Sequence, residues 1–248
     1  TWALIGLNVL AWVLVQGLGT EPALSRSLCN LALIPGEVLQ TVAVDQDVAH
    51  MVALTPDGGR AFVANIGSGT VTVLDLAEGR KIRDLSSGEG TEGVAVLRDG
   101  REAWLSNRAE DSITVFSAET LEELARLEAP GFPIRIEADP ARGRAYVTTP
   151  RADALRVFDV ARREQVALIE FEMGPDTEFA TLFGDAMPDS SIPIGVQLSD
   201  DGRWLAVAHS NARAVGIYDA ETLRREILLE VGNEPDGMAW SPLDVKAD

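Results

Sequence analysis

The stretch RAFVANIGSGTVTVLDL, residues 60–76, alternates apolar and polar side chains on both sides of a glycine-containing turn. Three later stretches repeat it in register, at residues 102–118, 144–160 and 204–220. The first three copies are spaced by 42 residues, and the fourth follows after 60, which is one step plus an insertion of 18. Alternation with period two is typical of a β-strand with one buried face. The repeat therefore predicts two paired strands in every copy.

Each copy is flanked by two further strands. A shorter apolar strand precedes it, at residues 51–54, 93–96, 134–138 and 194–198. The two are joined by polar turns such as TPDGG or SDDG, in which Gly supplies a positive φ and Asp bonds to its own backbone. A second turn downstream leads to an outer strand. Four antiparallel strands in each step of 42 residues predict an all-β fold with one β-propeller blade per repeat.

Partial blades are expected at both ends of the repeat region. EVLQTVAV (37–44) has the pattern of the outer strand of a preceding blade, and DGMAW (236–240) that of the inner strand of a following one. Four full repeats plus two half-blades give an incomplete propeller, expected over residues 38–248. Open strand edges and bare apolar faces pair with other chains, so self-association is expected as well.

TPDGGRAFVANIGSGTVTVLD (55–75) resembles the signature of the YVTN family of β-propeller repeats, and the resemblance extends over residues 38–240. It implies a non-catalytic binding module whose loop face meets a protein or a small-molecule ligand, with no cofactor. The alternative is a propeller enzyme of the lactonase or cofactor-binding oxidoreductase type. Such enzymes need a metal or a heme with several ligands, and the two widely separated histidines argue for the binding module.

Residues 1–20 carry no charge and are long enough to cross a hydrocarbon layer of ~30 Å as a helix. They predict a transmembrane helix, with a buried core helix or a cleaved signal peptide as alternatives. Together with SLCNLALIPGEVL in the connecting segment 21–37, they resemble the first transmembrane helix and following loop of rhomboid intramembrane proteases. The G-x-S-G motif of that family is absent, so no protease activity is expected. A transmembrane helix at residues 1–20 predicts a membrane-anchored protein, with the propeller in the periplasm or outside the cell.

The composition excludes several classes of partner and site. The formal net charge is −18, which repels phosphate backbones and makes nucleic acid an unsuitable partner. The single cysteine, Cys29, cannot form an internal disulfide, and two histidines offer little for a zinc site.

Alignment of the copies predicts two rings of side chains around the propeller axis. The first ring, at the start of the inner strands, holds His50, Glu92, Ile134, Ile194 and Asp236. The second, at the end of the next strands, holds Asn65, Asn107, Thr149 and His209. A histidine with two carboxylates binds a cation or acts as a general base; the alternative is that these side chains only solvate a wet channel. The polar members of both rings except Thr149 are the candidate binding residues, and no catalytic residue or metal ligand is assigned. His209 stands where other copies have a turn Asn, which favours a hydrogen bond to a nearby loop.

The insertion, at about residues 171–191, gathers four acidic side chains: Asp176, Glu178, Asp185 and Asp189. Calcium takes six to eight oxygen ligands, but the spacing D-x-D-x-D-G is missing. A short helix, TEFATLFGDA, that covers part of the propeller face is the favoured interpretation. Long loops of this kind are usually functional or disordered.

Overall fold

The computed structural model describes residues 41–97, 99–173, 187 and 189–241. The chain divides into two compact units, Thr1–Val42 and Ala43–Asp248. The predicted transmembrane helix and the rhomboid-like segment lie outside the described residues. Within the described residues, no helix has both the length and the apolar character that crossing a bilayer requires.

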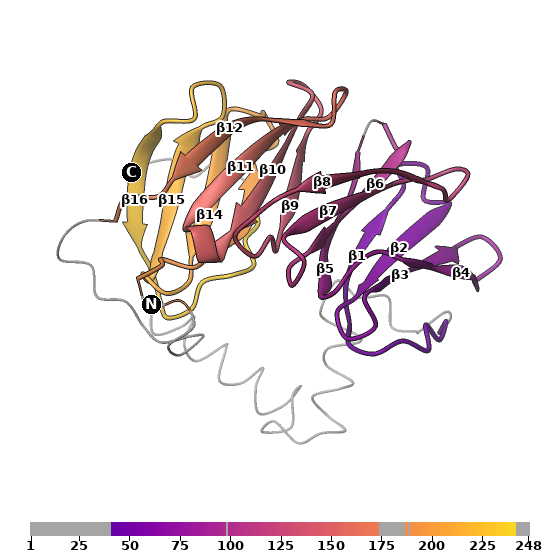
Figure 1. Cartoon of the computed structure of the whole chain (residues 1–248). Helices are drawn as coiled ribbons and strands as arrows, with labels where there is room; N and C mark the ends of the chain where they lie inside the picture. The colour runs from indigo at the N-terminus through magenta and orange to yellow at the C-terminus, as the bar shows by residue number, and fades with distance from the viewer. Residues whose placement is uncertain (1–40, 98, 174–186, 188, 242–248) are drawn as a thin grey trace, which may run out of the picture. The chain divides into compact units, whose positions relative to one another are not determined.

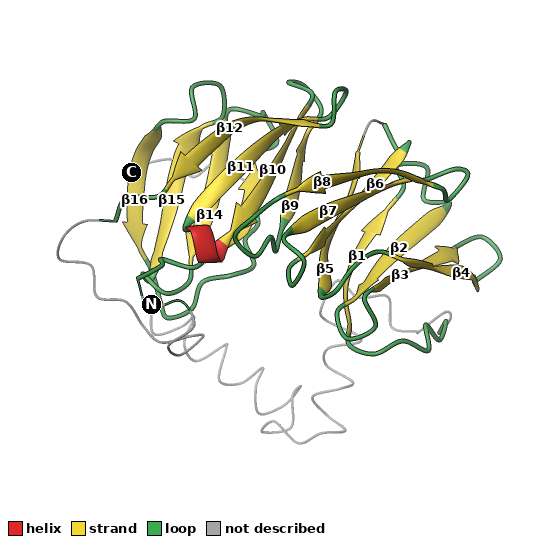
Figure 2. Ribbon diagram, in the orientation of Figure 1, coloured by secondary structure: helices red, strands yellow, loops and turns green. Residues whose placement is uncertain are grey.

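The second unit consists of four antiparallel sheets of four strands, each formed by one sequence repeat (Figures 1 and 2). Blade 1 holds β1 (Ala49–Leu54), β2 (Arg60–Asn65), β3 (Thr70–Asp75) and β4 (Arg80–Ser86). Blade 2 holds β5 (Thr91–Leu97), β6 (Glu102–Asn107), β7 (Ser112–Ser117) and β8 (Glu123–Glu128). Blade 3 holds β9 (Ile136–Asp139), β10 (Arg144–Thr149), β11 (Ala154–Asp159) and β12 (Glu164–Glu170), with the 3-10 turn Pro150–Ala152 between β10 and β11. Blade 4 holds β13 (Pro193–Leu198), β14 (Trp204–His209), β15 (Ala214–Asp219) and β16 (Arg225–Glu230). The sheets confirm the all-β fold and are those of an incompletely closed β-propeller.

The turns form for the local reasons that the sequence indicates. In the turn between β1 and β2, the Asp57 carboxylate accepts hydrogen bonds from the Thr55 hydroxyl (2.6 Å) and the Gly59 amide (2.9 Å). Gly58 takes the positive φ of 69° that favours glycine. The hydroxyl and amide donors stabilise the carboxylate and hold the pKa of Asp57 below its usual range. The tight turn thereby fixes the register of the two strands that it joins.

The core lies between consecutive blades, because each sheet is apolar on both faces. The first strands of neighbouring blades contact one another, β1 with β5, β5 with β9 and β9 with β13, so the first strand of each blade is the inner one. Trp104 of blade 2 is fully buried and meets Phe158 of blade 3 edge-on, with ring centroids 6.2 Å apart. Aromatic contacts of this kind stabilise the stacking of one blade on the next.

The two predicted half-blades are not strands in the described residues. Residues 41–46 and 236–240 have no strand partner there. A β-strand exists through hydrogen bonds to the other strands of its own blade, and the described chain supplies none for either segment.

Candidate functional site

The first predicted ring comes together around Glu92, at the start of the inner strands. Glu92 is 5% exposed, and its carboxylate accepts hydrogen bonds from the guanidinium groups of Arg108 (2.5 Å) and Arg135 (3.1 Å). The Nδ1 atom of His50 lies 3.8 Å from the same carboxylate. Arg135 also reaches Asp236, at 3.3 Å. Arg135 therefore links Glu92 to Asp236, His50 lies next to Glu92, and the two isoleucines of the ring are buried.

Two arginines enclose an aromatic ring beside this cluster. The Cζ atoms of Arg108 and Arg151 lie 5.2 and 4.9 Å from the centroid of the Phe132 ring. Stacking on an aromatic face orients a guanidinium while its N–H donors still reach an anion. Here the anions are carboxylates of the chain itself: Arg108 and Arg135 pair with Glu92, and the Nη1 atom of Arg151 lies 4.0 Å from Asp111. We call Arg108, Phe132, Arg135 and Arg151 the arginine cluster.

Sequence reasoning missed all four members of the arginine cluster. For Arg135 the signal was present as a departure from the repeat. At the position of Arg135 the other copies have Met51, Gly93 and Gly195, all uncharged. A repeat position that is small or apolar in every other blade and charged in one of them indicates a local role. The alignment emphasised what the copies share, so it passed over that position.

The second predicted ring is buried within the separate blades. Asn107 is fully buried; its Oδ1 atom accepts from the hydroxyls of Ser87 (2.8 Å) and Thr91 (2.9 Å), and its Nδ2 atom donates to Ser112 and Thr114. It ties the loop that enters the inner strand to the two strands behind it. Asn65 donates in the same way to Thr70 (3.1 Å) and Thr72 (3.0 Å) of its own blade, and Thr149 is buried as well. Asn65 and Thr149 bond to the next strand of their own blades, and the buried Oδ1 atom of Asn65 has no hydrogen-bond partner within the described residues.

His209 holds the fourth blade in the same way. Its ring is fully buried, its Nδ1 atom lies 2.9 Å from the Ser191 hydroxyl, and its Nε2 atom lies 3.5 Å from the Tyr218 hydroxyl. The Ser191 hydroxyl also donates to Asp153, at 2.5 Å. Burial lowers the pKa of His209 to about 3, so the imidazole is neutral at physiological pH. The residue thus bonds to the loop before β13, as its place in the repeat suggests.

The acidic residues of the insertion show no site. Asp176, Glu178 and Asp185, with the predicted short helix, lie outside the described residues, and Asp189 is exposed. Among the residues that the structure describes, no three His, Cys, Asp or Glu side chains gather so as to hold a metal ion.

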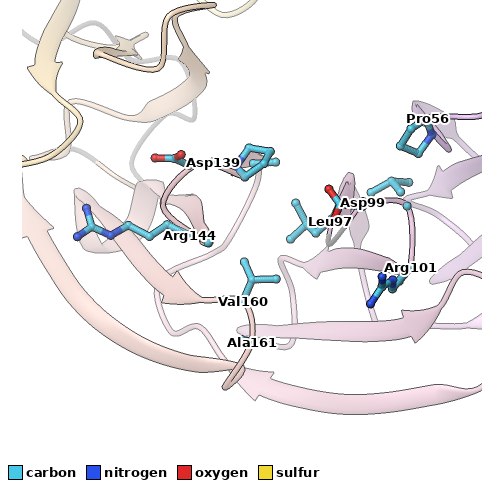
Figure 3. Close-up of a pocket in the computed structure, with 13 residues that line it drawn as sticks. Pro56, Leu97, Asp99, Arg101, Asp139, Arg144, Val160 and Ala161 are labelled. Atoms are coloured by element: carbon cyan, nitrogen blue, oxygen red, sulfur yellow. The ribbon is translucent and has the colours of Figure 1, made fainter.

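A cavity of about 380 Å³ lies at the other end of the inner strands (Figure 3). It opens between blades 2 and 3, and the residues that line it include Leu97, Arg101, Asp139, Arg144 and Val160. A similar space, lined partly by the turn before β2, lies between blades 1 and 2. Because a similar space lies between two different pairs of blades, both are grooves between turns that the stacking of blades creates.

A known protein family matches most of the chain. Residues 25–241 match the Cytochrome D1 heme domain. The chain belongs to this family. The match begins within the predicted connecting segment 21–37. It confirms the β-propeller, whereas the resemblances to YVTN repeats and to rhomboid proteases are not confirmed.

Solved structures similar to this heme-domain chain are propellers of greater length. Hydrazine synthase of Kuenenia stuttgartiensis superposes with a TM-score of 0.65 at 22% identity, covering 82% of this chain and 54% of its own. U3-55K superposes with a TM-score of 0.62 at 13% identity, covering 77% of this chain and 54% of its own. The dihydro-heme d1 dehydrogenase NirN, in complex with DHE, superposes with a TM-score of 0.59 at 17% identity, covering 76% of this chain and 38% of its own. The chain thus spans about half the length of the first two. Comparison with curated protein sequences finds no match.

The expected function, a non-catalytic binding module, is wrong. Membership of a heme-domain family supports the alternative, a cofactor-binding propeller. The error has a physical cause: two histidines were counted as too few ligands, but heme iron is already held by its macrocycle and needs only axial ligands from the protein. The expectation of a small-molecule ligand on the propeller stands.

Proposed function

We propose that this chain binds a heme-type tetrapyrrole at the His50 end of the inner strands, with His50 as the axial ligand of the iron. The accessibility of the imidazoles, within a heme-domain family, carries this proposal. The sequence has two histidines, and the His209 ring is fully buried with a hydroxyl beside each nitrogen. The His50 side chain is 42% exposed, so it alone is open to a ligand in the described structure.

The arginine cluster fits the rest of such a group. Tetrapyrroles of the heme type carry carboxylates, and guanidinium groups bind carboxylates through paired, charge-assisted hydrogen bonds. Arg108 and Arg135 already hold the Glu92 carboxylate, and Arg151, whose side chain is 54% exposed, lies 4.0 Å from Asp111. A carboxylate of the ligand has to share these guanidinium groups with the carboxylates of the chain. When bound, the group supplies one-electron chemistry at its iron, and the chain contributes the ligand, the charge and the orientation.

A cofactor-binding oxidoreductase is the activity class that we infer for the whole protein. The family description names a heme domain, and one similar structure is described as a heme d1 dehydrogenase. The chain covers 38% of that structure, so the activity class of the whole protein is part of this proposal. No catalytic residue is assigned within this chain.

Titration of the full chain with ferric heme, followed by visible absorption, tests the proposal. Binding is expected to shift the main absorption band to that of a histidine-ligated heme, and His50→Gln should abolish the shift because it removes the accessible imidazole. Arg126→Gln, on the outer strand of blade 2, is the matched control and should titrate like the wild type. If ferric heme shifts the absorption band of His50→Gln as it does that of the wild type, His50 is not the ligand.

We also propose that residues 1–20 anchor the chain in a membrane, with the propeller in the periplasm or outside the cell. The support is the uncharged run of residues, which is long enough to span a bilayer. Full-length protein should then sediment with membranes, and deletion of residues 1–36 should release it. Full-length chain that stays soluble without detergent contradicts the anchor.

A further inference from the structure

We propose that the groove between the outer strands of blades 2 and 3 binds a small oxyanion, a carboxylate or a phosphate, through Arg156 and Arg163. The groove has a volume of about 440 Å³, which lies within the range of small-molecule sites. The residues that line it include Arg126, Leu127, Pro130, Arg156, Phe158 and Arg163. None of them belongs to the arginine cluster, so this inference stands independently of heme binding.

Both arginines depart from the repeat. At the position of Arg156 the other blades have uncharged residues, Thr72, Thr114 and Gly216. At the position of Arg163, in the turn before the outer strand, they have Gly79, Leu121 and Leu223. The four residues of this turn position all take a positive φ, between 55° and 64°, which confirms that they are equivalent. The two charges therefore meet a requirement that blades 1, 2 and 4 do not share.

Arg156 is buried and has no counterion in the described part of the chain. Its Nε and Nη2 atoms donate to the Pro130 carbonyl (3.0 and 2.6 Å), and its Nη1 atom donates to the side-chain oxygen of Gln165 (2.8 Å). None of these acceptors is a carboxylate, and the guanidinium forms no ion pair with a described residue. A guanidinium has five N–H donors, so two of them remain for a ligand.

The loop that enters blade 3 does not require this charge to hold it. In blade 2 the residue equivalent to Arg156, Thr114, donates from its hydroxyl to the carbonyl of Ser87 (3.1 Å), in the corresponding loop. A neutral hydroxyl is therefore enough for that role. Burial lowers the pKa of Arg156, and the charge of Asp111 opposes this only in part. A buried charge without a partner lowers stability, and a bound oxyanion would offset that loss.

Arg163 supplies the second set of donors. Its side chain is 28% exposed, and its Nη2 atom donates to Glu102 (2.9 Å). Its Nη1 atom has no acceptor among the described residues, and neither has its buried Nε atom. Arg126 also lines the groove, but it already pairs with two glutamates of its own blade. The site is therefore assigned to Arg156 and Arg163.

The surroundings of the two arginines indicate the class of ligand. Guanidinium groups bind carboxylate and phosphate oxygens through paired, charge-assisted hydrogen bonds. Leu127 and Pro130 offer apolar surface to the carbon skeleton of an organic acid, and one carboxylate, Glu128, lines the groove against three guanidinium groups. Since the chain has a net charge of −18, long-range attraction does not bring anions to it, and binding depends on these local donors.

Isothermal titration calorimetry of the full chain with citrate and with inorganic phosphate, at neutral pH and constant ionic strength, tests the proposal. The wild type should bind at least one of the two, and the tighter probe identifies the ligand as a carboxylate or a phosphate. Arg156→Thr, which introduces the residue of blades 1 and 2, should weaken binding about tenfold or more, because it removes charge-assisted hydrogen bonds. Arg163→Gln leaves Arg156 in place and should weaken binding about threefold or more. Arg83→Gln, which removes an exposed positive charge from the outer strand of blade 1, is the matched control and should bind like the wild type.

Several results overturn the proposal. It fails if neither anion binds the wild type. It fails if Arg163→Gln binds as tightly as the wild type, and this measurement decides even if Arg156→Thr does not fold. It also fails if Arg151→Gln abolishes binding while the groove variants retain it, because the anion then lies in the arginine cluster.

Discussion

The buried imidazole of His209 should make the propeller sensitive to mild acid. In the folded chain, burial holds its pKa at about 3, whereas an unfolded histidine titrates near ~6.5. The unfolded state therefore binds the proton first as the pH falls. The contribution of His209 to stability is fully present above about pH 6.5 and is lost as the pH falls from there towards 3.

The size of the loss follows from the distance between the two pKa values. Each pH unit between them costs about 1.4 kcal/mol, so lowering the pH from 7 to 5 should reduce the free energy of unfolding by about 2 kcal/mol. The charged and titratable neighbours of the ring are Arg225, Asp153 and Tyr218. Burial raises the pKa of Asp153, so the folded state binds this proton more readily and the effect of Asp153 on stability in acid is opposite to that of His209. Burial also raises the pKa of Tyr218, to about 12. Both remain in the variants compared below, so they cancel to first order.

Urea unfolding of the full chain at pH 7 and at pH 5 measures the effect. His209→Gln keeps a polar side chain in the space but cannot titrate, so it should be less stable at pH 7 and lose about 2 kcal/mol less than the wild type on going to pH 5. His50→Gln is the matched control, because it removes the other imidazole of the chain and retains His209. If His209→Gln loses as much stability in acid as the wild type, the buried-imidazole argument is refuted.

Two further substitutions test the packing. Trp104→Ala, which empties the interface of blades 2 and 3, should cost about 3–5 kcal/mol of unfolding free energy, whereas Trp204→Ala, at a half-buried site under Arg203, should cost clearly less; equal losses would contradict the blade-interface core. Tyr146→Phe removes a hydroxyl that donates to Asp139 at 2.8 Å, so denaturation at neutral pH should show a loss of about 1–3 kcal/mol, and an unchanged midpoint would contradict a contribution from this bond.

The blades were predictable because their determinants are local and repeated. The alternation in residues 60–76 identifies β2 and β3 as strands, although both faces of these strands are buried and not one as expected. Four copies in register remove the ambiguity of a single short strand. The turn chemistry of Asp57 and Gly58 was equally readable, since it depends only on neighbours in the sequence.

The site was predictable only in part, because its contacts join residues from different blades. The ring alignment brought His50, Glu92 and Asp236 to one end, and the structure links them. The link itself, Arg135, comes from a third blade, and its reach to Glu92 and Asp236 depends on how blades stack. The stacking of one blade on the next is set by the side chains packed between the sheets and not by the pattern within a strand.

Departures from the repeat therefore carry more functional information than the repeat itself. Where all blades agree, as in the apolar alternation, the shared residue serves stacking, which every blade must do. Where one blade differs, the residue meets another requirement. Arg135 stands where the other blades have Met51, Gly93 and Gly195, and it meets two carboxylates. His209 stands where other blades have asparagine, and it anchors the loop after the insertion. A heme-type ligand needs one imidazole and a few guanidinium groups at unequal positions, which a perfect repeat cannot provide. The asymmetry among the four blades provides the unequal positions that the proposed ligand site requires.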